Sequence, residues 1–186
     1  MRIITGRARG VKLLTLEGSN TRPTADRTKE AIFSMLQFEI EGRSVLDLFS
    51  GSGQMALEAV SRGAASAVLC DKAKDAMAII SKNVEKTRLG DSCILVNSDH
   101  ADCIQRMARM GKQFDIVFLD PPYASDLVTD ALTRMAKAGI LKPTSTVICE
   151  SGNSDFLIPE EYEIKKQSKY GIAYVTVLNL KKEADQ

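Results

Sequence analysis

Four consecutive residues, Asp120-Pro121-Pro122-Tyr123, offer the clearest chemistry in this 186-residue chain. They supply a carboxylate, two prolines with fixed φ and no N–H, and an aromatic ring. Such a set suits an exocyclic amine on a flat base. The ring would stack on the base, while Asp120 and the carbonyl of Pro121 or Pro122 would accept the two amino hydrogens. The alternative is a proline-rich turn that merely ends a strand.

The elements that must position this motif form an alternating pattern. The motif directly follows the apolar run 114–119, which is typical of a buried strand in a parallel sheet, where ligands bind at the carboxyl ends of strands. Further strands are predicted at 45–49, 66–70, 93–96 and 146–150, and helices at 24–38, 54–62, 73–88, 99–110 and 126–138. Runs 162–166 and 173–180 have no helix between them and read as an antiparallel pair. Five βα units and a terminal hairpin predict an open, twisted α/β sheet.

A glycine-rich turn follows the first of these strands. Gly51 and Gly53 permit a tight turn and a close backbone approach to a ligand. A dinucleotide site would have G-x-G-x-x-G, with bare N–H groups facing a pyrophosphate. Here Asp47 precedes the glycines and Phe49 occupies the first glycine position. This arrangement favours a cationic, phosphate-free cofactor such as S-adenosylmethionine, the alternative being a purely structural turn.

Two more acidic residues end the next strands. Asp71 is placed to bind ribose hydroxyls. Asp99 resembles the residue that commonly contacts the adenine amino group in methyltransferases, which implies the same role for it. Each could instead cap the helix that follows it. His100, the only histidine, is expected at a surface position in a first helical turn.

Composition narrows the class of protein. The chain is expected to be a single domain, residues 1–186, and no apolar stretch approaches the roughly 20 residues of a membrane span. Four cysteines without C-x-x-C spacing indicate reduced thiols in a cytoplasmic protein, and one histidine argues against a metal site. The net charge of +1 hides an asymmetry: residues 1–29 carry seven basic and two acidic residues, against 18 and 22 in residues 30–186. A basic arm suggests contact with a polyanion, although a solvated terminus would look the same.

The chain as a whole resembles a known family, the small-subunit ribosomal RNA guanine-N2 methyltransferases known as RsmD. The resemblance covers roughly residues 1–180 and rests on segments 1–7, 10–13, 21–33, 45–53, 57–64, 118–123 and 170–171. It implies a Rossmann-like, seven-stranded class I methyltransferase sheet with an N-terminal β-hairpin extension, S-adenosylmethionine as cofactor, and 16S ribosomal RNA, within an assembled or assembling subunit, as partner. Met55 and Asp71 depart from the family's frequent residues without changing the expected chemistry.

The N-terminal segments have their own expected roles. Residues 1–23 form a basic arm with a short hairpin between Gly6 and Gly10, and residues 24–180 form a cap helix and the catalytic sheet. Arg22 precedes Pro23 and is therefore extended, after which Thr24 caps the helix. The resemblance implies that this segment closes over cofactor and base, which assigns Thr24 to the cofactor. The residues expected to meet RNA are Arg7, Arg9, Lys12, Arg22 and Arg27.

The expected chemistry is the alignment of a guanine amino group with the methyl group of the cofactor. A guanine N2 lone pair is delocalised into the ring, so Asp120 and a motif carbonyl would favour pyramidalisation, and Tyr123 would stack the extruded base. The alternative activity is adenine-N6 methylation of DNA or RNA, because adenine methylases share the motif. An NAD-dependent oxidoreductase would share only the sheet, and a non-catalytic RNA-binding module would not need the intact motif. We expect a cytoplasmic monomer with no membrane contact.

Overall fold

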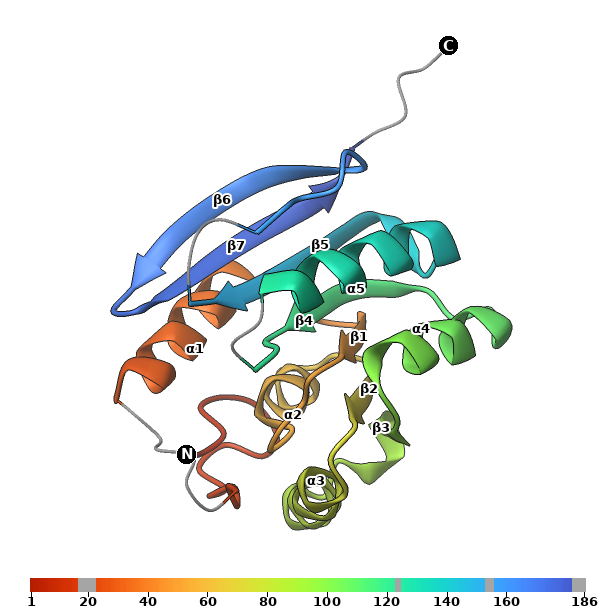
Figure 1. Cartoon of the computed structure of the whole chain (residues 1–186). Helices are drawn as coiled ribbons and strands as arrows, with labels where there is room; N and C mark the ends of the chain where they lie inside the picture. Colours follow the sequence, from red (N-terminus) through yellow and green to blue (C-terminus); the bar gives the residue numbers. More distant parts are fainter. Residues whose placement is uncertain (17–22, 123–124, 153–155, 182–186) are drawn as a thin grey trace.

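The computed structural model describes residues 1–16, 23–122, 125–152 and 156–181. Seven strands form one sheet in the order β3-β2-β1-β4-β5-β7-β6 (Figure 1). The strands are β1 (Ser44–Asp47), β2 (Ser66–Asp71), β3 (Cys93–Asn97), β4 (Phe114–Leu119), β5 (Leu141–Ser151), β6 (Tyr162–Tyr170) and β7 (Ala173–Leu180). The helices are α1 (Pro23–Met35), α2 (Gln54–Ser61), α3 (Lys74–Thr87), α4 (His100–Arg109) and α5 (Ser125–Ala138), with a short 3₁₀ turn η1 (Gly90–Ser92).

The direction of the strands confirms the predicted α/β sheet. Strands β1 to β5 run parallel, and β7 lies antiparallel between β5 and β6. The chain passes outward from β1 to β3 and then returns to β4, which pairs with β1 on its other side. The strand order therefore reverses between β1 and β4, and this is the point at which open α/β sheets bind ligands.

Two hydrophobic layers cover the sheet. One face packs against α1, α2 and α3 around Phe33, Leu57 and Ile80, and the other against α4 and α5 around Met107 and Leu132 (Figure 1). All six residues of β4 are buried, as a central strand covered on both faces requires.

Several helix and strand boundaries differ from those predicted. Helix α1 begins at Pro23, so Thr24 lies inside the first turn and is not the residue before the helix, as predicted. Proline favours this first helical position, because its φ is preset and the N–H it lacks would have no intrahelical partner. The helix also ends at Met35, short of Phe38, which is 93% exposed. Strand β6 is longer than predicted because its pairing with β7 continues to Tyr170. Strand β5 begins earlier than predicted, at Leu141, which pairs with Phe114 of β4.

The N-terminal arm folds back as a hairpin-like loop. One antiparallel bridge joins Arg2 to Lys12, and the arm buries Ile3, Ala8 and Leu13 in the core beneath α2. Gly6 has φ +88°, and a Cβ there would lie 1.8 Å from the Ser61 carbonyl oxygen. The arm is thus part of the packed domain. In the described part of the chain, no helix is long and apolar enough to cross a membrane.

Candidate active site

A cavity of about 830 Å³ opens at the carboxyl ends of β1, β2, β3, β4 and β5. The charged side chains that line it are mainly acidic, with Lys72 and Arg134 as the cationic ones among the described residues. The acidic side chains in the lining are Asp47, Asp71, Asp99, Asp120, Asp130 and Glu150. Such a lining favours ligands that carry positive charge or N–H donors.

The glycine turn after β1 forms one wall. Gly51 has φ +55° and open space where a Cβ would be, whereas a Cβ on Gly53 would lie 2.9 Å from Leu69. The first glycine leaves the turn open toward a ligand, and the second lets α2 pack tightly onto the sheet. The Asp71 carboxylate fixes this turn by accepting the Gly51 N–H at 2.9 Å.

Asp47 lies at the base of the same turn. It is 3% exposed, and its carboxylate accepts the Ala56 N–H at 3.4 Å. Burial is the main cause that raises its pKa to about 7, and the nearby charges of Asp120 and Asp71 add to the effect. A bound ammonium group would relieve this cost, because an opposite charge favours the ionised carboxylate.

Asp71 and Asp99 both have structural bonds at their predicted places. Asp71 accepts the Ala73 N–H at 2.9 Å, while Asp99 is the cap of α4 and accepts the Asp102 N–H at 2.8 Å. The capping alternative therefore holds for Asp99, whereas α3 is preceded by Ala73, which makes no side-chain cap. Both carboxylates also line the cavity, and their roles toward a cofactor stay predictions.

The expected surface position of His100 is wrong. Its ring is 12% exposed, lines the cavity and lies 5.4 Å from the Phe49 ring, centroid to centroid. The His100 Nε2 atom is hydrogen-bonded to the Asp130 carboxylate at 2.7 Å, and the same carboxylate accepts from Arg134 Nε at 2.7 Å. The sequence gives no sign of this contact, because His100 and Asp130 come from different helices.

Asp120, Pro121 and Pro122 form another part of the wall. Asp120 directly follows β4 and is reached by solvent through the cavity, but the walls around it limit hydration, and this desolvation raises its pKa to about 6. Pro121 is buried, Pro122 is exposed, and both line the cavity. Tyr123 lies outside the described residues. The predicted catalytic and cofactor segments therefore meet in one cavity.

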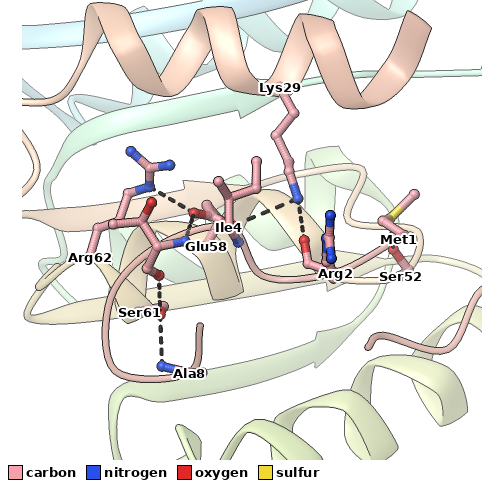
Figure 2. Close-up of polar contacts among 10 residues, drawn as sticks. Met1, Arg2, Ile4, Ala8, Lys29, Ser52, Glu58, Ser61 and Arg62 are labelled. Atoms are coloured by element: carbon pink, nitrogen blue, oxygen red, sulfur yellow. Dashed lines mark hydrogen bonds and ion pairs between the residues drawn. The ribbon is translucent and has the colours of Figure 1, made fainter. Parts of the chain in front are cut away.

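A buried carboxylate that the sequence pattern does not reveal connects the arm to helices α1 and α2 (Figure 2). Glu58 on α2 is fully buried and accepts the backbone N–H groups of Ile4 at 2.7 Å and Thr5 at 3.1 Å. It also accepts from Arg62 Nε at 2.7 Å and pairs with Lys29 Nζ of α1 at 3.6 Å. Lys29 in turn donates to the Arg2 carbonyl at 2.8 Å.

The residues expected to meet RNA are not gathered at the cavity. Arg7 and Arg9 are exposed, but the Arg7 N–H bonds to Ser61, the last residue of α2, whereas the first residue of that helix lines the cavity. Eight helical residues rise about 12 Å, which separates the loop from the site. Lys12 is exposed in the bridge with Arg2, and Arg27 is exposed on α1. Arg22 lies outside the described residues, and so does the side chain of Thr24.

This sheet order, with the cavity at the reversal point and an aspartate-proline pair beside it, defines a Rossmann-like methyltransferase fold. The Escherichia coli protein yhhF, described as a candidate methyltransferase, superposes with a TM-score of 0.86 and 28% identity, covering 98% of this chain and 99% of that one. A second solved structure, a methyltransferase-like protein in complex with S-adenosylhomocysteine, shares only the fold, at 17% identity and a TM-score of 0.69.

The chain belongs to the family described as Conserved hypothetical protein 95, which it matches over residues 1–179. It is 32% identical to the Haemophilus influenzae protein named Ribosomal RNA small subunit methyltransferase D, over 92% of this chain and 90% of that protein. The Escherichia coli protein of the same name is also 32% identical, over 94% of this chain and 87% of that protein. The family resemblance drawn from the motifs is confirmed.

Proposed function

We propose that this protein transfers a methyl group from S-adenosylmethionine to the N2 amino group of a guanine in 16S ribosomal RNA. One observation carries the proposal: the Asp120-Pro121-Pro122 segment opens into the same cavity as the glycine turn and the three acidic strand ends. A methyltransferase needs two adjoining subsites, one for the methyl donor and one for an amine. The names of the relatives, which specify ribosomal RNA of the small subunit, support this substrate.

The residues present fit such a cofactor. The open position at Gly51 admits a ligand against the backbone, and Asp47 offers a carboxylate to an ammonium group. Gln54 Oε1 is buried in the cavity wall and has no hydrogen-bond partner among the described residues, so it lacks a donor that a ligand could provide. We assign the cofactor to Asp47, Phe49, Gly51, Gly53, Asp71, Asp99 and the segment around Thr24. When bound, S-adenosylmethionine supplies a methyl group activated by a sulfonium charge.

The chain's own residues would prepare the amine. The Asp120 carboxylate and a motif carbonyl accept the two amino hydrogens, which turns the nitrogen lone pair away from conjugation with the ring. Asp120 needs only to be ionised, since the amine becomes strongly acidic only after methylation. Its pKa of about 6 leaves it mainly ionised above neutral pH. Tyr123 would stack on the base, which must first leave its helix or loop.

The substrate also needs a positively charged surface. The exposed side chains of Arg7, Arg9, Lys12 and Arg27, with Arg22, are the groups we assign to phosphates. Because Arg7 and Arg9 lie a helix length from the cavity, the footprint would span several nucleotides. We expect a cytoplasmic monomer that acts on an assembled or assembling small subunit.

The test is methyl transfer to small ribosomal particles from a strain that lacks this protein, followed by nucleoside mapping. The expected product is N2-methylguanosine, and N6-methyladenosine would instead select the adenine alternative. Asp120→Ala should lower kcat by at least about 100-fold while cofactor affinity stays nearly unchanged. Asp91→Ala, an exposed carboxylate on η1, is the matched control and should keep full turnover. Unchanged turnover in Asp120→Ala would remove Asp120 from this role.

A further inference from the structure

A second carboxylate, Glu150, lies beside Asp120 at the edge of the sheet. Strands β4 and β5 pair in register up to Leu119 opposite Cys149. Asp120 follows Leu119 and Glu150 follows Cys149. The two acidic residues therefore lie side by side at the carboxyl ends of neighbouring strands. Both line the cavity. The signal that singled out Asp47, Asp71 and Asp120, an acidic residue after a buried strand, also marks Glu150 after Val147-Ile148-Cys149.

The backbone of Glu150 pairs with Val175 of β7, but its side chain makes no polar contact that would hold the fold in the described part of the chain. Its carboxylate makes no hydrogen bond and no ion pair with any residue in the described part of the chain, although it is only partly exposed. Burial, followed by the charge of Asp120, raises its pKa to about 7. A half-buried carboxylate beside a like charge is costly unless a ligand donates to it. Asp120 and Glu150 therefore offer two adjacent hydrogen-bond acceptors, which a ligand with two adjacent donors would satisfy.

Guanine and adenine differ in the hydrogen-bond groups that they could present to these two acceptors. Guanine carries the N1–H donor next to its N2 amino group, whereas adenine carries an N1 lone pair next to its N6 amino group. Enzymes that extrude a base recognise it through hydrogen bonds to its Watson–Crick edge, which carries these groups. Resting on the function proposed above, we propose that Glu150 accepts the N1–H of the target guanine while Asp120 accepts one of the N2 amino hydrogens and a motif carbonyl the other. Glu150 is then the residue that selects guanine over purines with an N1 lone pair.

The experiment compares guanine with 2-aminopurine at the methylated position of the particle. 2-Aminopurine keeps the 2-amino group but has a lone pair at N1 and no O6. The wild-type protein should prefer guanine in kcat/KM. In Glu150→Gln the side-chain amide can donate to the N1 lone pair, so the guanine to 2-aminopurine ratio should fall by roughly 10- to 100-fold, the range for a hydrogen bond to a charged group. The missing O6 affects both proteins alike and cancels from the comparison of ratios.

Controls separate this role from folding and from the proposed function. Glu163→Gln, an exposed carboxylate on β6, should leave the ratio unchanged. The melting temperature and affinity for S-adenosylhomocysteine of Glu150→Gln should match the wild type. If that variant does not fold, Glu150→Asp withdraws the carboxylate by one methylene and should slow guanine methylation without any gain for 2-aminopurine.

The outcomes are distinct. A wild-type protein that forms no N2-methylguanosine refutes the proposed function. A wild-type protein that forms it, with a ratio in Glu150→Gln within twofold of the wild type, refutes only the role of Glu150. An unchanged guanine rate in Glu150→Asp refutes that role as well.

Discussion

Replacing the buried Glu58 with glutamine should destabilise the protein strongly. Four donors converge on its carboxylate, from Ile4, Thr5, Lys29 and Arg62, and the Lys29 side chain is only 1% exposed. A glutamine of the same shape offers one acceptor oxygen and replaces the other with an NH₂ group that faces a donor. It also removes the negative charge of Glu58 that pairs with the Lys29 ammonium at 3.6 Å.

The expected cost follows from these contacts. Removing one partner of a buried ion pair costs about 3–5 kcal/mol, because the remaining charge stays buried and uncompensated. For a chain of this size each kcal/mol lowers the melting temperature by roughly 2–4 °C, so Glu58→Gln should lower it by about 6–20 °C. Urea unfolding followed by circular dichroism measures the free energy, and Glu85→Gln, an exposed carboxylate on α3, should change it by less than about 0.5 kcal/mol.

A double-mutant cycle tests the mechanism. If the loss arises from breaking the pair of Glu58 and Lys29, then Glu58→Gln combined with Lys29→Met should cost less than the sum of the single changes by at least about 1 kcal/mol. The backbone amides of Ile4 and Thr5 should also exchange faster with solvent in Glu58→Gln, because they lose their acceptor. A loss of stability below about 1 kcal/mol in Glu58→Gln would refute the reasoning.

Three further predictions concern cofactor, RNA and pH. Asp71→Ala should weaken S-adenosylmethionine binding by roughly 1.5–3 kcal/mol in calorimetry, and equal affinity would restrict Asp71 to holding the glycine turn. Neutralising Arg7, Arg9 and Lys12 together should lower the slope of log K against log salt for RNA binding by about 2–3, since each phosphate contact contributes roughly 0.7–0.9, and an unaltered slope would mean that the arm meets no phosphates. Burial raises the pKa of Asp47 to about 7 in the folded protein, whereas the carboxyl has its ordinary pKa of 3.8 in the unfolded chain. The cofactor-free protein should therefore lose stability as pH rises through this window, and Asp47→Asn should flatten that part of the melting profile; an identical profile would contradict the buried, protonated state.

Much of the sheet could be predicted because its signals are local. The run 114–119 is apolar throughout and becomes a strand buried on both faces, and Gly111 and Gly139 adopt positive φ where the helices before them end. The family motifs also placed Asp47 and Asp120 correctly at one cavity, because the carboxyl ends of parallel strands meet at one edge.

What the sequence could not show depends on partners distant along the chain. Glu58 reads as an ordinary charge on an amphipathic helix, four residues before Arg62, and only the arm and α1 make it a buried centre. The contact of His100 with Asp130 requires two helices to pack on one face. A role for Glu150 can be inferred only from the register of β4 and β5, which places it beside Asp120. The same limit applies to strand order, which depends on pairing and not on local pattern.

The position of β7 has a consequence for folding. Residues 173–180 form the last strand of the described chain, yet they lie inside the sheet and pair with both β5 and β6. Until this strand is synthesised, β5 has a bare edge and β6 has no partner. Unpaired strand edges promote aggregation, and pairing between distant segments slows folding. Shortening or weakening this strand should therefore first be seen as insoluble protein, because β5 and β6 are both made before the strand that pairs with them.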